Sequence, residues 1–206
     1  MTGLRLVLAR HAETDANLRL VLDSLPPGPP LNDLGRRQAA ELAETLAVEP
    51  VAGVYASTAI RAKQTAQPVA DRHGLPVDVV PGLHEVFMGD LEGTEDEASM
   101  RIFMGVAKAW SEGDLDRAMP GGESAREAVD RFTTAVKGIR ERHSHGVLVV
   151  VSHGALLRLG APSLAANLQV IDNLPLLPNT GRIVLDEDAG TPTGWRAVLW
   201  TGVPLN

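Results

Sequence analysis

The first apolar run of the chain is Leu4-Arg5-Leu6-Val7-Leu8-Ala9, and it passes directly into Arg10-His11. A short apolar run that ends in polar residues is typical of a strand buried on both faces of a mostly parallel sheet. Residues 51–56 and 146–151 repeat this pattern, and residues 75–80 form another short candidate strand. The pattern therefore predicts a central parallel sheet.

Segments with helical spacing separate these strands. A helix is expected from Asn32 or Asp33 to about Val48, with an apolar face made of Leu34, Ala39, Leu42, Ala43 and Leu46. A second helix follows Ser57-Thr58 and ends near His73, where Gly74 can adopt the left-handed conformation of a C-cap.

The second half of the chain continues the alternation of helices and strands. Residues 95–110 and 123–143 have helical spacing, and residues 155–171 form a candidate helix that Pro162 starts, breaks or kinks. Residues 181–185 and 195–200 are predicted to form a C-terminal hairpin. The alternation predicts an α/β fold, namely a three-layer α/β/α sandwich with a mostly parallel mixed sheet.

Length and composition narrow the class of protein. The 206 residues fit a single domain, 1–206, and no linker divides them. A formal net charge of −7 argues against nucleic acid or an anionic membrane as the partner. The absence of cysteine excludes disulfides and thiolate nucleophiles. The N-terminal apolar run is too short and too interrupted for a signal peptide, so we expect a soluble cytoplasmic protein.

Polar residues follow the predicted strands at their carboxyl ends, which is where ligands bind in open parallel sheets. Arg10-His11 follows the first strand, Arg61 lies just after the second, His84-Glu85 follows the third, and His153 follows the fourth. The sequence therefore predicts that two arginines (Arg10, Arg61), two histidines (His11, His153) and Glu85 meet at one edge of the sheet, with His84 next to Glu85.

This set of side chains suits phosphoryl transfer without a metal or other cofactor. A neutral imidazole of His11 is a competent nucleophile toward phosphorus, and Arg10, Arg61 and a protonated His153 can hold a phosphate dianion. Glu85 would protonate the leaving oxygen and then activate water. Glu13 and Glu92 are alternative carboxylates for this role.

The motifs resemble those of the histidine phosphatase superfamily, which includes cofactor-dependent phosphoglycerate mutase. They occur in the family's order and span nearly the whole chain: Arg10-His11-Ala12-Glu13-Thr14 with Asn17, Leu31 to Ala39, Ser57 to Ala66, Leu83-His84-Glu85 with Leu91-Glu92-Gly93, Gly121 to Ser124, and Val149 to Gly154. The resemblance implies a phosphoglycerate mutase-like fold.

The resemblance also implies roles for individual residues. His11 corresponds to the phosphorylated histidine, Arg10, Arg61 and His153 to the phosphate pocket, and Glu85 to the usual acid. Thr14, Asn17 and the backbone of Gly154 match secondary phosphate contacts of some members. His84 is a further candidate for substrate binding, with packing beside its neighbours as the alternative. Ala12 departs from the family pattern, which has glycine after the nucleophile.

A phosphatase that hydrolyses a small phosphate monoester is the favoured function. A phosphoglycerate mutase-type phosphoryl transferase is the alternative, and a non-catalytic phosphate-binding module is a third. The predicted lid-like insertion, residues 92–119, is short and partly acidic, whereas the typical mutases carry a longer basic insertion there. Together with the proline-rich loop 24–30 it is expected to flank the pocket mouth.

Two further features leave alternatives open. His143 and His145 could bind a metal, but no third ligand lies nearby, and we expect a solvated turn and no metal site. The C-terminal hairpin could pair two chains into a homodimer or simply complete the sheet.

Overall fold

The computed structural model describes residues 3–168 and 176–205. Its sheet has seven strands in the order β3-β2-β4-β1-β5-β6-β7. The strand bounds are β1 Leu4–Arg10, β2 Val51–Ala56, β3 Val77–Val79, β4 Gly146–Ser152, β5 Arg182–Glu187, β6 Trp195–Trp200 and β7 Val203–Pro204. Strands β1 to β4 pair in parallel and β5 to β7 add antiparallel pairs, so the mixed, mostly parallel sheet is confirmed.

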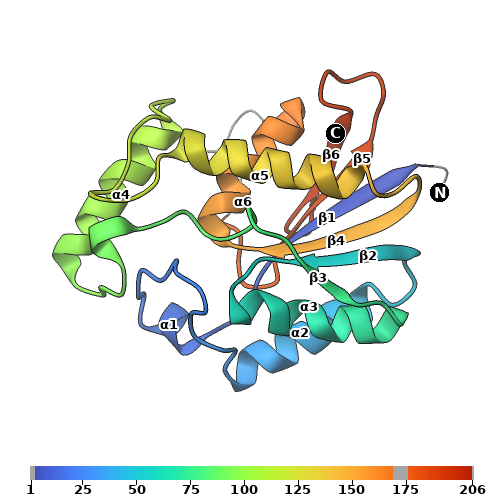
Figure 1. Ribbon diagram of the computed structural model, residues 1–206, viewed down its shortest axis with the longest axis horizontal. Helices are drawn as coiled ribbons and strands as arrows, with labels where there is room; N and C mark the ends of the chain where they lie inside the picture. Colours follow the sequence, from blue (N-terminus) through green and yellow to red (C-terminus); the bar gives the residue numbers. More distant parts are fainter. Residues whose placement is uncertain (1–2, 169–175, 206) are drawn as a thin grey trace.

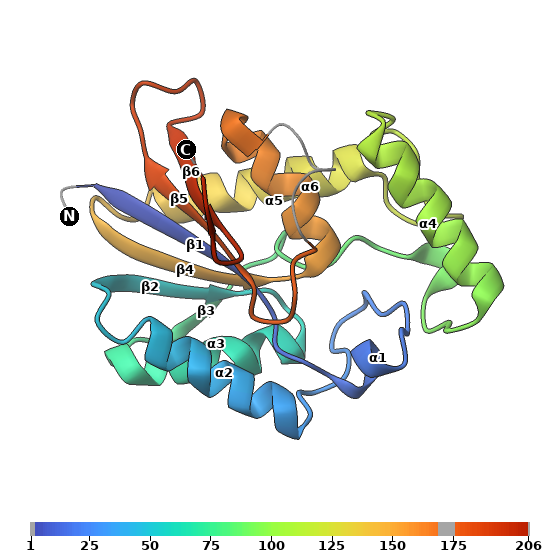
Figure 2. The same cartoon turned by 180° about the vertical axis from the view of Figure 1, so that it is seen from behind.

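Helices cover both faces of this sheet (Figures 1 and 2). Helices α2 and α3 lie on one face, and α5 and α6 lie on the other. The helix bounds are α1 Asp15–Leu18, α2 Asp33–Thr45, α3 Ile60–His73, α4 Glu97–Ser111, α5 Ala125–Arg140 and α6 Gly154–Leu164. The predicted three-layer α/β/α arrangement is therefore present, and α4 extends from the layers beside α1 at one end of the molecule.

Strand β1 explains why both faces must be covered. Its alternate residues enter different cores, since successive side chains of a strand point to opposite faces. Leu6 and Leu8 belong to the cluster that contains Phe132 of α5. Val7 belongs to the cluster that contains Leu42 of α2. The uninterrupted apolar run thus corresponds to a strand with two buried faces.

Several details differ from the predictions. The placement of Leu34 on the apolar face is wrong: Leu34 is 41% exposed, because Gly35 is the residue of the first turn of α2 that packs against the Glu13 backbone. Helix α2 ends at Thr45, and β3 is shorter than predicted. Helix α6 ends two residues after Pro162, and the predicted continuation over 169–171 lies outside the described residues.

The turn after His11 accommodates Ala12 without strain. Ala12 is fully buried, and it is absent from the non-glycine residues with positive φ. Its backbone N–H donates to Oγ1 of Thr65, and its side chain packs with Leu31 and Ala39. Alanine therefore replaces the family's usual glycine in a conformation that L-residues adopt readily.

None of the helices in the described residues has the length and apolar character needed to cross a lipid bilayer.

Candidate active site

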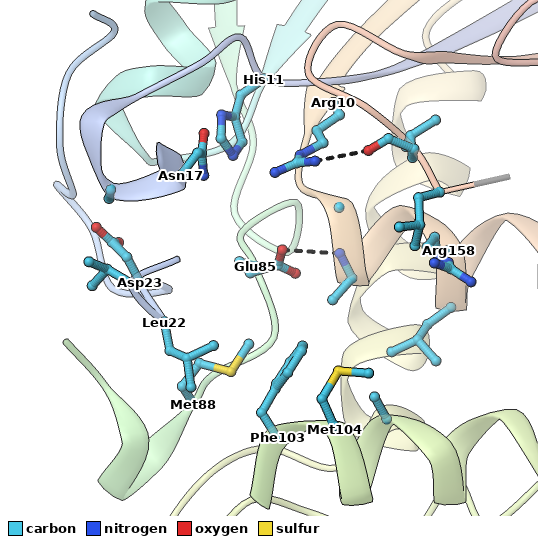
Figure 3. A pocket seen from close by; sticks show the side chains of 18 of the residues that line it. Arg10, His11, Asn17, Leu22, Asp23, Glu85, Met88, Phe103, Met104 and Arg158 are labelled. Carbon is cyan, nitrogen blue, oxygen red and sulfur yellow. Dashed lines mark hydrogen bonds between the residues drawn. The ribbon is translucent and has the colours of Figure 1, made fainter. Parts of the chain in front are cut away.

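A cavity of about 610 Å³ opens at the carboxyl end of β1 and β4. Figure 3 shows Arg10 and His11 at one end of this cavity and Glu85 in its middle. Arg61, Thr14, Asn17 and Gly154 also line it. The structure thus brings residues from four separate parts of the sequence to one place, as their positions after the strands predicted.

His11 is held in one tautomer. Its backbone N–H donates to the Ser152 carbonyl of β4, which fixes the chain at the end of β1. Its Nδ1 lies 2.8 Å from the Ala12 carbonyl oxygen, and because a carbonyl only accepts, Nδ1 carries the proton. Burial, with the charges of Arg61 and Arg10, lowers the pKa of His11 well below its usual value. The Nε2 lone pair is therefore available for nucleophilic attack.

Arg10 presents an unsatisfied donor next to this nucleophile. One Nη donates to the Leu177 carbonyl at 2.9 Å. Its Nε is a buried side-chain atom with no hydrogen-bond partner within the described ranges. A β-carbon at Gly154 would lie 3.3 Å from that Nε, so glycine leaves the guanidinium room at the start of α6. A buried donor without an acceptor is expected to recruit an anion.

Arg61 lies in the first turn of α3 and is only 3% exposed. Its guanidinium donates to the Asp23 carboxylate at 3.2 Å and to the Asp23 carbonyl at 3.1 Å. The proline-rich loop packs against it, since Gly28 has a φ of 62° and a β-carbon there would collide with the guanidinium. Pro29 of the same loop lines the cavity, so this loop flanks the pocket as predicted.

His153 lies behind the cavity wall rather than on it. It is fully buried, and its ring centroid is 5.2 Å from that of His11. Nδ1 faces an Nη of Arg61 at 3.3 Å, so it must accept, and Nε2 then donates to Oγ of Ser57 at 2.7 Å. Burial and the charge of Arg61 lower the pKa of His153 well below its usual value. His153 is therefore neutral in this pocket, whereas the sequence predicts the protonated form.

Glu85 is oriented by backbone donors at the start of α6. Oε1 accepts from the N–H of Val86 and of Leu156, and Oε2 accepts from the N–H of Ala155. The N-terminus of a helix favours an acidic group at this place. The other two candidate acids are used elsewhere: Glu13 accepts from Asn32, and Glu92 accepts from Ser24 and lines a different cavity.

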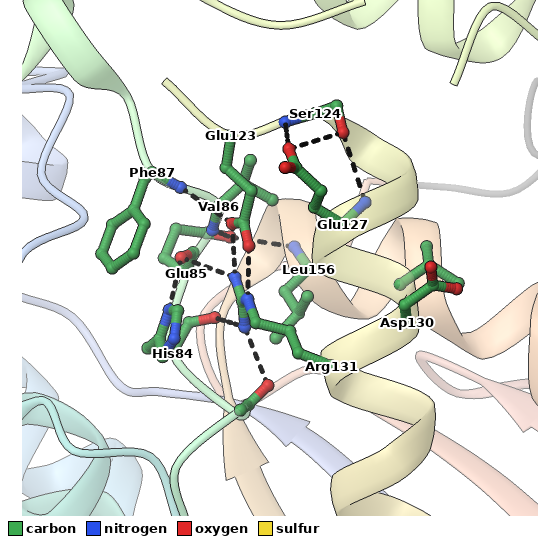
Figure 4. A network of polar contacts seen from close by, with 12 residues as sticks. His84, Glu85, Val86, Phe87, Glu123, Ser124, Glu127, Asp130, Arg131 and Leu156 are labelled. Atoms are coloured by element: carbon green, nitrogen blue, oxygen red, sulfur yellow. Dashed lines mark hydrogen bonds and ion pairs between the residues drawn. The ribbon is translucent and has the colours of Figure 1, made fainter. Parts of the chain in front are cut away.

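Arg131 of α5 supports the segment that carries Glu85 (Figure 4). Its guanidinium forms an ion pair with Glu123 at 2.6 Å. It also donates to the carbonyls of Gly82, His84 and Glu85. Because one side chain fixes three carbonyls in four residues, Arg131 is a positioning residue for the Glu85 segment.

Arg131→Met is expected to destabilise the fold by about 3 kcal/mol, since it leaves the mostly buried Glu123 carboxylate without its partner. Urea denaturation would measure this loss. Arg126→Met on the same helix is the matched control, because the Arg126–Asp116 pair is exposed and should contribute little. Equal shifts in the two variants would contradict the role given to the Arg131 network.

Of the candidates for substrate binding, Thr14 and Asn17 line the cavity and His84 does not. Thr14 caps α1 with Asn17 in a capping box, and both residues line the cavity. His84 is not among the lining residues: its ring stacks on Phe87 with centroids 4.7 Å apart, and its Nδ1 lies 3.1 Å from the Glu85 carbonyl. The geometry therefore favours the packing alternative for His84.

The sequence did not point to three residues that line the cavity or contact residues lining it. Asp23 and Arg158 line the cavity, and Asn179 donates to the His11 carbonyl and to the Asn17 side chain. Asp23 and Asn179 lie in loops, and Arg158 lies within α6, so none of them directly follows a strand. The only sequence feature that could have pointed to Asp23 is an acidic side chain close in sequence to Arg10-His11.

Within the described residues, His143 and His145 are not part of any group of three or more potential metal ligands. His143 is not a simply solvated turn residue either, because its Nε2 lies 2.6 Å from the Tyr55 hydroxyl.

The two buried histidines predict an acid-sensitive fold. A histidine in the unfolded chain has a pKa near 6.5. In the folded chain the pKa values of His11 and His153 both lie well below this value. Below about pH 6.5 the unfolded state therefore binds more protons, and stability falls as the pH falls. Each histidine contributes up to about 1.4 kcal/mol per pH unit until its folded-state pKa is reached.

Urea denaturation at pH 7 and pH 5 tests this expectation. His153→Gln removes one titrating group and should lose less stability between the two pH values than the natural chain. His145→Gln, which replaces an exposed histidine outside the site, is the matched control. An unchanged pH dependence in His153→Gln would show that His153 does not titrate in this way.

Comparison with known proteins first defines the class. A solved structure of mycobacterial glucosyl-3-phosphoglycerate phosphatase superposes with a TM-score of 0.79 at 26% identity, covering 97% of this chain and 99% of that one. The same phosphatase has been solved with inorganic phosphate and with VO3, at TM-scores of 0.78 and 0.80. The chain thus has the α/β fold of phosphoglycerate mutase-like phosphatases.

The sequence then gives the family. Residues 6–201 match the profile of the histidine phosphatase superfamily (branch 1), and the chain belongs to that family. The predicted family and fold are confirmed.

Relatives in the family include both phosphatases and mutase-like proteins. Glucosyl-3-phosphoglycerate phosphatase of Mycolicibacterium vanbaalenii is 33% identical over 95% of this chain and 93% of its own length. Phosphoglycerate mutase-like protein 4 of Arabidopsis thaliana is 38% identical over 74% of this chain and 67% of its own. PE_PGRS11 of Mycobacterium tuberculosis is 31% identical over 95% of this chain, which spans only 36% of that longer protein.

Proposed function

We propose that this chain is a metal-independent phosphatase that hydrolyses a small phosphate monoester through a phosphohistidine on His11. The observation that carries the proposal is the His11 ring, whose protonated Nδ1 is bonded to a carbonyl while Nε2 lies beside Arg10 and its unpaired Nε. A neutral nucleophile next to unsatisfied cationic donors suits attack on a phosphate dianion.

The reaction would take place in two displacements. In the first, Nε2 of His11 attacks phosphorus, the bond to the ester oxygen breaks, and Glu85 in its acid form gives its proton to that oxygen. In the second, the Glu85 carboxylate takes a proton from water, whose oxygen attacks the phosphohistidine and releases phosphate and free His11. Arg10 and Arg61 offset the charge on the equatorial oxygens, and His153 holds Arg61 through Nδ1.

Two observations favour water over a second substrate as the acceptor. The cations of α4 are engaged with nearby acids, since Arg101 pairs with Glu97 and Lys108 with Glu112. Asp23 adds a carboxylate to the cavity wall. A mutase has to hold a bisphosphate, and this wall offers few free cations for its second phosphate. The relatives include a phosphatase and a mutase-like protein, so they support membership of the family and do not decide between the two activities.

Turnover of p-nitrophenyl phosphate at acidic and neutral pH, in the presence of EDTA, tests the proposal. We expect EDTA-resistant release of nitrophenolate and inorganic phosphate in equal amounts. Adding 3-phosphoglycerate as an acceptor should not reduce the yield of inorganic phosphate. Transfer to the acceptor in place of phosphate release would establish the mutase alternative, and activity that EDTA abolishes would contradict the metal-free reaction.

A further inference from the structure

The cavity continues well beyond the phosphoryl site. Figure 3 shows Leu22, Met88, Phe103 and Met104 on the side of Glu85 away from His11. All four side chains are apolar, and all four line the cavity. We call the part of the cavity that these four side chains line the outer chamber.

The geometry of the proposed reaction directs the leaving group into the outer chamber. Attack by Nε2 of His11 requires the leaving oxygen to lie on the opposite side of phosphorus, roughly in line. Glu85, the proposed proton donor, lies between His11 and the outer chamber. An ester whose oxygen faces Glu85 therefore extends its alcohol portion past Glu85, between α4 and α6.

The walls of the outer chamber are apolar where a sugar or an acid would need polar partners. Leu22 and Met88 are buried apolar side chains. Met104 is 58% exposed and Leu176 is 76% exposed, and both line the cavity. Exposed apolar side chains that line a cavity are typical of a surface that an apolar ligand covers.

The charges near the outer chamber are largely engaged. Asp23, beside Leu22, is paired with Arg61 and would repel a second anion close to the phosphoryl group. Lys108 is paired with Glu112. Arg158 has no ion pair within the described residues, and it is the one lining cation there that could favour a leaving group with a distant negative charge.

We infer that the substrate is a phosphate monoester of an alcohol with a bulky apolar body, aliphatic or aromatic, which packs against Phe103 and Met104. This inference rests on the proposed phosphoryl chemistry at His11. Transfer of apolar surface from water to the outer chamber then provides the discrimination between substrates.

Binding of n-alkylphosphonates, from methyl to hexyl, tests the inference without requiring turnover, because the carbon–phosphorus bond is not hydrolysed. Titration calorimetry should show the Kd falling about fourfold for each added methylene until the outer chamber is filled. Phe103→Ala should weaken this dependence on chain length and leave the Kd of methylphosphonate unchanged. Ile102→Ala is the matched control, since Ile102 is 43% exposed on the same helix and does not line the cavity.

Three outcomes would overturn the inference. A Kd that is independent of chain length would show that the outer chamber does not hold the alcohol. Tighter binding of a phosphonate with a terminal carboxylate than of its methyl-ended counterpart, abolished by Arg158→Met, would assign an anionic leaving group. Failure of every phosphonate to bind would contradict the proposed phosphoryl site as well.

The same data separate this inference from the proposed function. A normal dependence on chain length in a protein that hydrolyses no ester would contradict the phosphatase and leave the apolar outer chamber supported. Conversely, turnover of p-nitrophenyl phosphate with a flat alkyl series would support the phosphatase alone.

Discussion

His11→Ala is expected to reduce turnover of p-nitrophenyl phosphate by at least about 10⁴-fold, because it removes the proposed nucleophile. The arginines would remain in place, since neither Arg10 nor Arg61 depends on a hydrogen bond from the His11 ring. The variant should therefore still bind inorganic phosphate while it turns over no ester. Steady-state kinetics and phosphate titration measure the two properties separately.

A control distinguishes loss of chemistry from loss of fold. His145→Ala changes an exposed histidine and should retain full turnover. Rapid acid quench of the natural chain with radiolabelled substrate should trap an acid-labile phosphoenzyme that His11→Ala lacks. Trapped label of equal amount in His11→Ala would place the covalent intermediate on another residue and contradict the proposed mechanism.

The strands and the residues that follow them could be predicted because both depend on local sequence. Uninterrupted apolar runs such as residues 146–151 leave little alternative to a buried parallel strand. Arg10 is the last residue of β1, His11 follows it directly, and His153 directly follows β4. Parallel strands bring these ends to one edge, so sequence order was sufficient to assemble the centre of the candidate site.

The walls of the cavity could not be predicted in the same way, because they depend on how distant elements approach. Helical spacing over residues 95–110 predicts a helix, but it does not say that Phe103 and Met104 of α4 would face the cavity. Asp23 reaches Arg61 only because the loop after α1 folds back over α3. The position of His153 behind Arg61, and its neutral form, likewise follow from burial that the sequence does not reveal.

Glu85→Gln is expected to lower kcat/KM for an alkyl phosphate by about 10²- to 10⁴-fold, which is the usual contribution of a general acid. The loss on p-nitrophenyl phosphate should be much smaller, because nitrophenolate leaves without needing a proton. The comparison uses kcat/KM because this constant reports steps up to the first irreversible one. Slow hydrolysis of the phosphohistidine, in which Glu85 also acts, would then not hide the difference.

The difference between the two substrates also separates acid catalysis from a change in geometry. Glu85 accepts three backbone N–H bonds, and the amide introduced by Glu85→Gln would turn one acceptor into a donor opposite the N–H of Ala155 or of Val86 and Leu156. A displaced side chain would lower kcat/KM for both substrates to a similar degree, whereas loss of the proton would lower kcat/KM selectively for the alkyl ester. Equal losses would therefore remove Glu85 as the acid and leave it a role in positioning the start of α6.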